Sequence, residues 1–236
     1  MKRYNILGVI PARGGSKGIK NKNIHLLNGF PLIYHTINEG MKSKLLTDLI
    51  VSTDSIDIKN ISEKYGAECP FIRPKELSTD NALAIPTVQH AVRTYEKIVG
   101  FKYDFILMLQ PTAPLRKAND IDSALVELIT KCADAIISVV DVDNFHPFKM
   151  KTIDNGFLND YKDYEVENPP RQELPSVFIV NGAIYATKRD VLMKQNTFKG
   201  KNCLPYIMPQ ERSVNIDNFT DFIVAEYYMN EEKVNY

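Results

Sequence analysis

Residues 11–23 combine backbone freedom with positive charge. The stretch holds three glycines and four cations, namely Gly14, Gly15, Gly18, Arg13, Lys17, Lys20 and Lys22. Glycine lets the backbone approach a ligand closely, and successive N–H groups in such a turn can bind an anion. The cations could neutralise a polyphosphate, and Ser16 adds a neutral donor. The spacing fits neither the Walker loop nor the dinucleotide fingerprint, so a solvated basic turn is an equal alternative.

Residues 110–116 form a second polar stretch, directly after the apolar residues 105–109. Pro111 and Pro114 stiffen the turn, which would present Gln110 and Thr112 at the end of the preceding strand. The same composition is ordinary turn chemistry in many α/β proteins, so the residues alone assign no role.

Two later places carry groups suited to charged ligands. Arg171 offers a planar fork that fits a carboxylate, although it could equally pair with Glu165 or Glu167. Asn215 and Asp217 alternate, so in an extended segment they share one face. Asp217 could instead cap the last helix, or serve both purposes.

The elements that must position these residues alternate between apolar runs and helical stripes. We predict strands and helices in turn at residues 6–10, 32–37, 48–54, 56–65, 68–72, 88–99, 105–109, 121–132 and 135–140. This order implies right-handed crossovers and a mainly parallel sheet flanked by helices, in one α/β domain over residues 1–236. Because ligands bind beyond the carboxyl ends of such strands, Arg13, residues 52–54 and residues 110–116 should surround one crevice.

The alternation breaks at residues 141–176, which we interpret as a protruding β-rich excursion. Asn155-Gly156 within it is a hairpin signal. Residues 177–186 then return as a strand, in which Gly182 suggests a close backbone approach. A short helix near Asp190, a strand at residues 206–208 and a final helix opened by Asn218 complete the prediction.

Composition excludes several classes of protein. Hydrophobic residues make up 44% of the 236, enough for a substantial core, while 29 Lys and Arg balance 29 Asp and Glu. This balance gives no reason to expect binding to nucleic acid or to a membrane, so a phosphate site would need local charge. We expect a cytoplasmic protein as the simplest case. The three cysteines are far apart in the sequence, no apolar stretch reaches membrane-spanning length, and the N-terminus lacks an adequate apolar core for a signal peptide.

Four blocks in order resemble the cytidylyltransferases that activate nine-carbon, sialic-type sugars. They are residues 10–18 with Lys22 and Asn23, residues 109–116, residues 170–175 with 181–185, and residues 214–217. The resemblance implies a Rossmann-like α/β fold. It also implies that the first loop holds the phosphates of CTP through Ala12, Arg13, Gly14, Gly15, Ser16, Lys17, Lys22 and Asn23. Lys20 departs from the family, which usually has a proline near this position.

The resemblance also implies roles for the later blocks. Asp80 and its neighbours would lie near the cytosine base. The sugar would be positioned by Gln110, Lys149, Arg171, Gln172, Asn181 and Tyr185. Mg²⁺ would bind at Asp217 and Asn215, where the family generally has two aspartates; an amide brings no charge, so we expect weaker metal binding. The excursion would pair two subunits of a homodimer and lend Lys149 and Arg171 to the neighbouring site.

These implications predict transfer of CMP from CTP to an acidic nine-carbon sugar, with release of pyrophosphate. Arg13, Lys22, Gln110 and Asp217 would be the central catalytic group, acting by alignment and charge neutralisation. Two alternatives stay open. One is a cytidylyltransferase for another acidic sugar, such as an eight-carbon keto acid, and the other is a regulator that binds nucleotide sugars without turnover.

Overall fold

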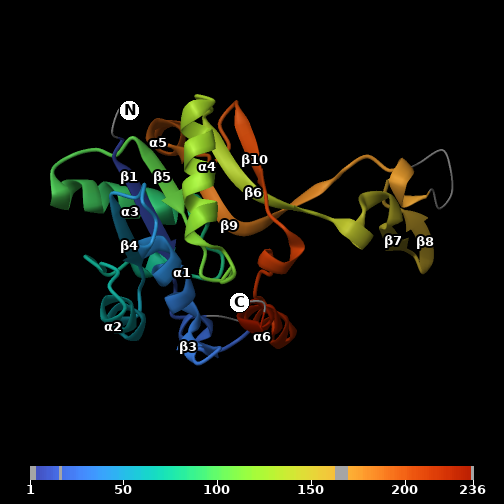
Figure 1. The fold of residues 1–236 in the computed structure, drawn as a ribbon, viewed down its shortest axis with the longest axis horizontal. Coiled ribbons are helices and arrows are strands. Elements are labelled where there is room, and N and C mark those ends of the chain that lie inside the picture. The colour runs from blue at the N-terminus through green and yellow to red at the C-terminus, as the bar shows by residue number, and fades with distance from the viewer. Residues whose placement is uncertain (1–3, 16–17, 163–169, 235–236) are drawn as a thin grey trace.

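The computed structural model describes residues 4–15, 18–162 and 170–234. Its centre is a six-stranded sheet in the order β10-β6-β9-β5-β1-β4 (Figure 1). The strands are β1 (Ile6–Pro11), β4 (Asp48–Ser52), β5 (Phe105–Met108), β6 (Ala135–Asp141), β9 (Phe178–Lys188) and β10 (Cys203–Ile207). Neighbouring strands are parallel except at β9, which runs antiparallel between β5 and β6. The mixed α/β class with a mainly parallel sheet is therefore as predicted.

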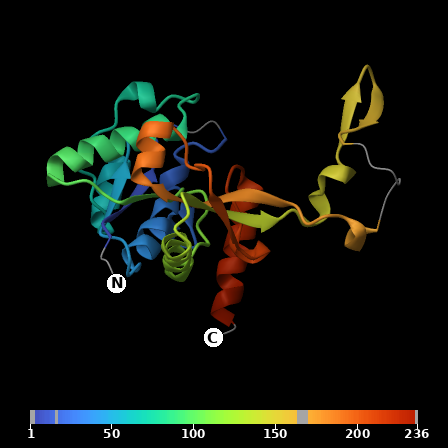
Figure 2. The ribbon, with the colours of Figure 1, turned by 90° about the horizontal axis from the view of Figure 1, so that it is seen from above.

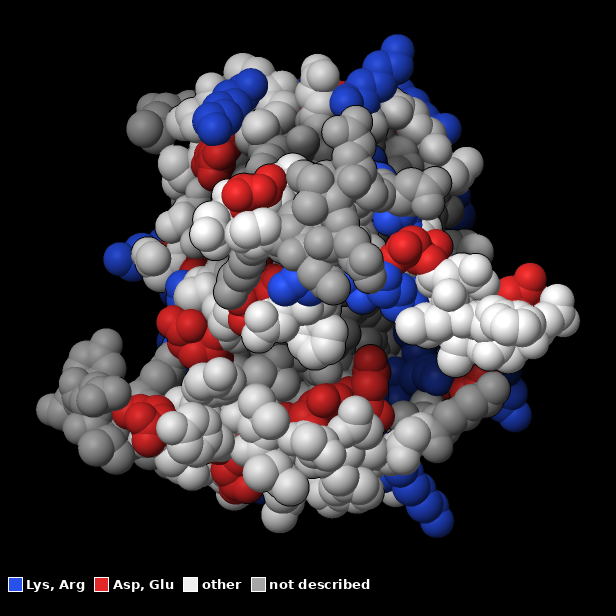
Figure 3. All heavy atoms as spheres, turned by 90° about the vertical axis from the view of Figure 1, so that its right-hand side faces the viewer, with Lys and Arg blue, Asp and Glu red and all other residues white. Residues whose placement is uncertain are grey.

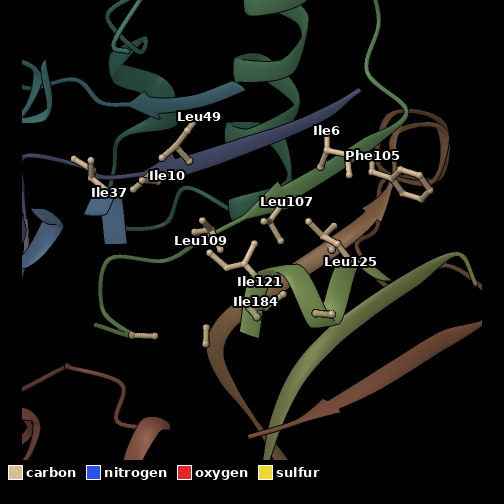
Figure 4. Close-up of a cluster of buried hydrophobic side chains, with 14 of the residues drawn as sticks. Ile6, Ile10, Ile37, Leu49, Phe105, Leu107, Leu109, Ile121, Leu125 and Ile184 are labelled. Carbon is tan, nitrogen blue, oxygen red and sulfur yellow. The ribbon is translucent and has the colours of Figure 1, made fainter. Parts of the chain in front are cut away.

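Helices cover both faces of the sheet because β1 presents apolar side chains alternately to each. Ile6 and Ile10 pack under α1 (Leu32–Met41), α2 (Ile56–Lys64) and α4 (Ala118–Thr130), in the cluster that Figure 4 shows. Leu7 and Val9 pack on the other face with α3 (Ala84–Val99) and α5 (Arg189–Gln195). A strand buried on both faces is typical of a parallel sheet, and it explains the unbroken apolar run of β1.

The last helix, α6 (Phe219–Val234), lies outside these two layers (Figure 2). A separate small cluster, in which Phe222 and Ala225 meet Leu115 and the fully buried Ile216, fastens it to the body. The short hairpin of β2 (Leu26–Leu27) and β3 (Phe30–Pro31) contributes Leu27 to the same cluster. This cluster keeps the segment before α6 close to the loops after β1 and β5.

Between β6 and β9 the chain leaves the body as an arm, which Figures 1 and 2 both show projecting to one side. Its tip is the hairpin of β7 (Lys151–Asp154) and β8 (Phe157–Asp160), turning at Asn155-Gly156 as the dipeptide predicts. His146 at its base is buried, accepting from the Phe148 amide and facing the Pro175 carbonyl at 3.0 Å. On the face of the molecule from which the arm projects, acidic and basic side chains are interspersed and do not form a patch of one sign (Figure 3).

Two details of the structure depart from the prediction. Residues 68–72 form only isolated bridges to the β4 region instead of a strand, because Pro70 has no N–H to donate to a ladder. The strand pattern of β9 was recognisable, but its antiparallel direction was not predicted. Within the described residues, no helix has the length and apolar character needed to cross a membrane.

Candidate active site

A cavity of about 430 Å³ opens where β1 and β5 end. This is the carboxyl edge of the sheet, where ligands of α/β proteins bind. Among the described residues, seventeen line it: Pro11, Arg13, Gly15, Lys22, Asn23, Arg73, Leu77, Thr79, Asp80, Ala82, Ala84, Thr87, Gln110, Pro111, Thr112, Asn215 and Asp217. A second hollow of about 530 Å³, over α1 and residues 114–117, includes none of the predicted site residues.

The loop after β1 is held in place by contacts on either side of Arg13. The Gly14 amide donates to Asp54 at 2.9 Å, and Asn23 Nδ2 donates to the Arg13 carbonyl at 2.9 Å. The Arg13 guanidinium reaches across the cavity, with Nη1 2.9 Å from both the Asp80 carboxylate and the Thr79 carbonyl. The loop is thus positioned, and its main cation is paired, before any ligand arrives.

The other members of the predicted phosphate loop divide into three groups. Gly15 lines the cavity and has open space around it, as a backbone donor for a ligand requires. Ala12 is fully buried, its amide donates to the Ser52 carbonyl, and it does not line the cavity, so it anchors the loop instead of facing a ligand. Ser16 and Lys17 lie outside the described residues.

Lys22 joins this loop to the segment before α6. Its Nζ donates to the Ile216 carbonyl at 2.7 Å and to the Asp217 carboxylate at 3.1 Å. The Asp217 side chain is 75% exposed, whereas Lys22 is only 13% exposed. Gly18 packs against the Asp217 carbonyl so closely that a Cβ there would lie 2.7 Å from the oxygen. Close packing and charge therefore both fix the loop against this segment.

Asn215 and Asp217 both line the cavity because Ile216 between them turns into the core. The cap of α6 is a different pair: Asn218 Oδ1 accepts from the Asp221 amide, and Asp221 accepts from the Asn218 amide. Asp217 is therefore not needed as the cap and can face a ligand. One carboxylate and one amide oxygen on a shared face fit Mg²⁺ that keeps phosphate and water ligands as well. Among the described residues, no three His, Cys, Asp or Glu gather as a metal group.

Gln110 meets the bulged part of β9 at Gly182. The glycine has φ +79°, and a Cβ there would lie 2.7 Å from Gln110 Oε1 and 3.6 Å from Asn215 Cγ. The sequence suggested a close approach at this glycine, and the structure shows that the neighbours are two predicted site residues. The turn after β5, the bulge in β9 and the segment before α6 thus converge at one point.

Arg116, fully buried behind this point, ties the same pieces together. Its guanidinium donates to the Ala183 carbonyl at 2.6 Å, to Thr36 Oγ1 at 2.8 Å and, more weakly, to the Gln110 carbonyl at 3.4 Å. Burial lowers the pKa of Arg116 to about 10, with Asp120 and Glu39 opposing the shift. The side chain therefore positions the Gln110 turn instead of facing the cavity.

Two predicted sugar ligands lie behind the cavity. Asn181 is buried, and its amide is used inside the protein: Oδ1 accepts from Ser138 at 2.6 Å and Nδ2 donates to Ser213 at 2.9 Å. Tyr185 packs in the apolar cluster under α3, close to Phe198, and burial raises its pKa. The structure thus gives both side chains positioning and packing contacts, and neither lines the cavity.

The other predicted sugar ligands are on the arm. Lys149 is exposed at the end of the 3-10 helix Pro147–Lys149. Gln172 lines a hollow of about 350 Å³ at the base of the arm with Asp141 and His146. The backbone of Arg171 begins the 3-10 helix Arg171–Glu173, and its side chain is outside the described part of the chain. Neither Lys149 nor Gln172 lines the cavity of its own chain.

Arg73 is a cavity residue that the sequence analysis did not single out. Its side chain is almost fully buried, donates to Ser78 at 2.9 Å and faces Asp54 at 3.7 Å. Burial lowers its pKa, and Arg13 lowers it further against the opposing effect of Asp54. A lone arginine between a predicted strand and Pro74 carried no recognisable signal, because only the fold brings it beside Asp80.

Comparisons with known proteins agree with this geometry. Residues 7–196 match the family model described as Cytidylyltransferase. The post-translational flagellin modification protein B of Campylobacter coli is 33% identical over 97% of this chain and 97% of its own. The CMP-N,N'-diacetyllegionaminic acid synthase of Legionella pneumophila is 32% identical over 95% of this chain and 96% of its own.

The same architecture is found in a solved structure, that of CMP:2-keto-3-deoxy-manno-octonic acid synthetase complexed with CTP. It superposes with a TM-score of 0.73 over 97% of this chain and 99% of the other, at 16% identity. At that identity the likeness concerns the fold. Together with the family match over most of the sequence, it leads to one conclusion: the chain belongs to the cytidylyltransferase family.

Proposed function

We propose that this protein transfers CMP from CTP to the anomeric hydroxyl of a nine-carbon 2-keto sugar acid of the sialic, legionaminic or pseudaminic type. The observation that carries the proposal is the convergence of Arg13, Lys22, Gln110 and Asp217 on one cavity. The Legionella relative is named a CMP-N,N'-diacetyllegionaminic acid synthase, which supports the substrate class.

In the reaction, the anomeric oxygen of the sugar bonds to the α-phosphorus of CTP. The bond between that phosphorus and the bridging oxygen breaks, pyrophosphate leaves with the electron pair, and the proton of the anomeric hydroxyl passes to water. Arg13 and Lys22 would exchange their carboxylate partners for phosphate oxygens and so neutralise the charge that develops. Gln110, held by Gly182, would orient the attacking oxygen.

Mg²⁺ is part of the proposal, with Asp217 as its carboxylate ligand and Asn215 as an uncharged one. The metal would supply charge neutralisation of the triphosphate. Because the two side chains offer only one negative charge, phosphate and water would complete the shell. Among the described lining residues there is no histidine, so alignment and charge carry the mechanism, with no dedicated side-chain base.

A homodimer with shared sites completes the proposal. The arm exposes large apolar side chains, among them Ile153, Phe157 and Leu158, which are 77%, 74% and 68% exposed. A second copy of the chain would bury them, since apolar surface of this kind favours an interface. Lys149 and Arg171 on the arm would then act in the cavity of the neighbouring subunit, where Arg171 would recognise the carboxylate of the sugar.

The proposed activity is tested by incubating the protein with CTP, Mg²⁺ and N-acetylneuraminic, legionaminic, pseudaminic or an eight-carbon 3-deoxy keto acid. We expect sugar-dependent pyrophosphate release and a CMP-sugar mass with at least one nine-carbon acid. Turnover of the eight-carbon acid alone would favour the other enzyme class. CTP binding in a calorimeter without any turnover would favour the regulator, and neither binding nor turnover would overturn all three.

A further inference from the structure

Asp120 is a buried carboxylate that no step of the proposed mechanism uses. It lies in the first turn of α4 with its side chain 2% exposed. It accepts from the Lys117 amide at 2.9 Å, from Tyr206 Oη at 3.1 Å and from Arg212 Nη1, which lies 2.9 and 2.8 Å from its two oxygens. Both carboxylate oxygens are therefore used, and Arg212 is the cation in direct contact with them, while Arg116 interacts with the same carboxylate electrostatically.

Arg212 is placed at the entrance of the segment that carries Asn215 and Asp217. It ends the 3-10 helix Gln210–Arg212, and the chain continues extended across the cavity edge. The Ile216 amide then donates to the Thr112 carbonyl at 2.7 Å. Between these two points, Ser213 accepts from Asn181.

The partner of Arg212 belongs to the other side of the cavity. Residues 110–116 lead directly into α4, whose first turn contains Asp120, and Arg116 fixes that turn from behind. The ion pair and the Ile216–Thr112 hydrogen bond thus join the same two pieces of chain at two separate points. Two tethers restrict sliding and rotation of one piece against the other, which a single hydrogen bond cannot do.

We propose that the Asp120–Arg212 pair is a positioning device that sets where Asn215 and Asp217 lie relative to Gln110. This inference rests on the proposed function for its kinetic consequence, because Gln110 and Asp217 must meet the same substrate. The claim that the pair fixes the register of residues 213–217 against the Gln110 turn does not depend on the proposed function. A buried carboxylate with one cation in direct contact is costly to leave unpaired, so the pair selects one arrangement of the segment.

The chain offers a matched control in the Arg189–Glu96 pair. Arg189 donates to Glu96 through Nε at 2.6 Å and Nη2 at 2.8 Å, with side chains 16% and 9% exposed. It lies at the amino-terminal edge of the sheet, where the Arg189 amide donates to Asp104 just before β5. Breaking either pair removes a partly buried arginine from a carboxylate, but only the Asp120–Arg212 pair is next in sequence to the Gln110 turn and to residues 213–217.

The test compares Arg212→Met, Arg212→Lys and Arg189→Met, with Asp120→Asn/Arg212→Gln as an uncharged pair in case the first variant fails to fold. For Arg212→Met or the uncharged pair we expect kcat to fall on the order of a hundredfold, because misplacement by about 1 Å has that scale, with a smaller change in the KM of the sugar. Arg212→Lys should recover most of the rate. Arg189→Met should lower the melting temperature and leave kcat within about twofold of the wild type.

A second readout needs no turnover. Hydrogen exchange at the Ile216 amide should speed up on the order of tenfold or more in Arg212→Met and in the uncharged pair, and stay unchanged in Arg189→Met. Equal losses of kcat in the Arg212 and Arg189 variants, or unchanged exchange at Ile216, would overturn the positioning role. If the wild type itself turned over no sugar, the proposed function would fail, while the exchange comparison would still decide the register.

Discussion

At the scale of single residues, the cavity holds its cations paired with its own carboxylates. Arg13 faces Asp80 and Lys22 faces Asp217 at 2.9 and 3.1 Å. Partly exposed pairs of this kind contribute little to stability, about 0–1 kcal/mol each. A triphosphate, with more charge than one carboxylate, can therefore displace them at low cost. The pairing keeps both cations ordered and oriented into the cavity until that exchange.

Replacing Arg13 with alanine removes the cation that reaches furthest across the cavity. We expect Arg13→Ala to lower kcat/KM for CTP on the order of a hundredfold or more, because it removes charge neutralisation of the transferring phosphoryl group. Unfolding free energy should change by less than about 1 kcal/mol. Pyrophosphate release and a thermal melt measure the two effects. Lys20→Ala is the control, since Lys20 is exposed in the same loop and does not line the cavity; unchanged turnover in Arg13→Ala would refute the role of the loop.

Asn215 is the uncharged member of the proposed metal-binding pair. Because Asn215 and Asp217 share the cavity face, Asn215→Asp should place a second charge beside the metal. We expect the Mg²⁺ concentration for half-maximal rate to fall about tenfold, equivalent to about 1.4 kcal/mol. Asn218→Asp is a matched control: it adds the same charge at the helix cap, where aspartate is equally suitable. Identical Mg²⁺ titrations for the wild type and Asn215→Asp would exclude position 215 from the metal site.

At the scale of elements, β9 shows what the sequence did and did not determine. Its apolar pattern and its glycine were visible, because alternation and Gly182 are local signals. Its direction and its bulge were not, since both depend on partners more than forty residues away, such as Ser138, which bonds the Ile184 amide and carbonyl inside the bulge. The same bulge buries the Asn181 side chain, which therefore bonds to other protein groups. The sequence had suggested that it would bind the sugar.

Gly182 gives a test of that bulge. A Cβ there would add a left-handed backbone penalty of about 1–2 kcal/mol and would meet Gln110 Oε1 at 2.7 Å. Gly100 has nearly the same φ, +80° against +79°, but open space around it. We expect Gly182→Ala and Gly100→Ala to lose similar stability in denaturant unfolding, and only Gly182→Ala to lose turnover as well. Equal turnover in both variants would show that the Gln110 contact has no bearing on the reaction.

The convergence on the cavity was predictable to the extent that it follows from topology. Loops after β1 and β5 must meet because both strands end at one edge, so Arg13 and Gln110 could be paired from the sequence. The contributions of Arg73 and of the Asp120–Arg212 pair could not. Each of these contacts joins two segments that are brought together by the packing of loops. The types and spacing of the residues in the sequence do not indicate that these segments are neighbours.

At the scale of the whole molecule, the arm projects away from the body of the chain (Figure 2), and the body carries the cavity. Lys149 and Gln172 belong to the arm, and every described residue that lines the cavity belongs to the body. A substrate carboxylate bound in the cavity would therefore have neither Lys149 nor Gln172 beside it unless a second chain supplied them. This separation gives the proposed homodimer a functional consequence that can be measured without a structure of the dimer.

Mixing two inactive variants tests whether the site is shared. Arg13→Ala removes a proposed catalytic residue from the cavity and leaves the arm intact. Arg171→Ala removes the proposed carboxylate ligand from the arm and leaves the cavity intact. After unfolding and refolding together in equal amounts, about half of the dimers should be mixed. In each mixed dimer one cavity has an intact Arg13 and an intact arm from its partner, so about a quarter of wild-type activity should return.

The same mixture of Arg13→Ala with Lys22→Ala is the control, because both changes lie in the body and no site regains both residues. Mixed dimers confirmed by mass but lacking activity would show that each chain uses its own Arg171, and a monomer by light scattering would remove the shared site altogether.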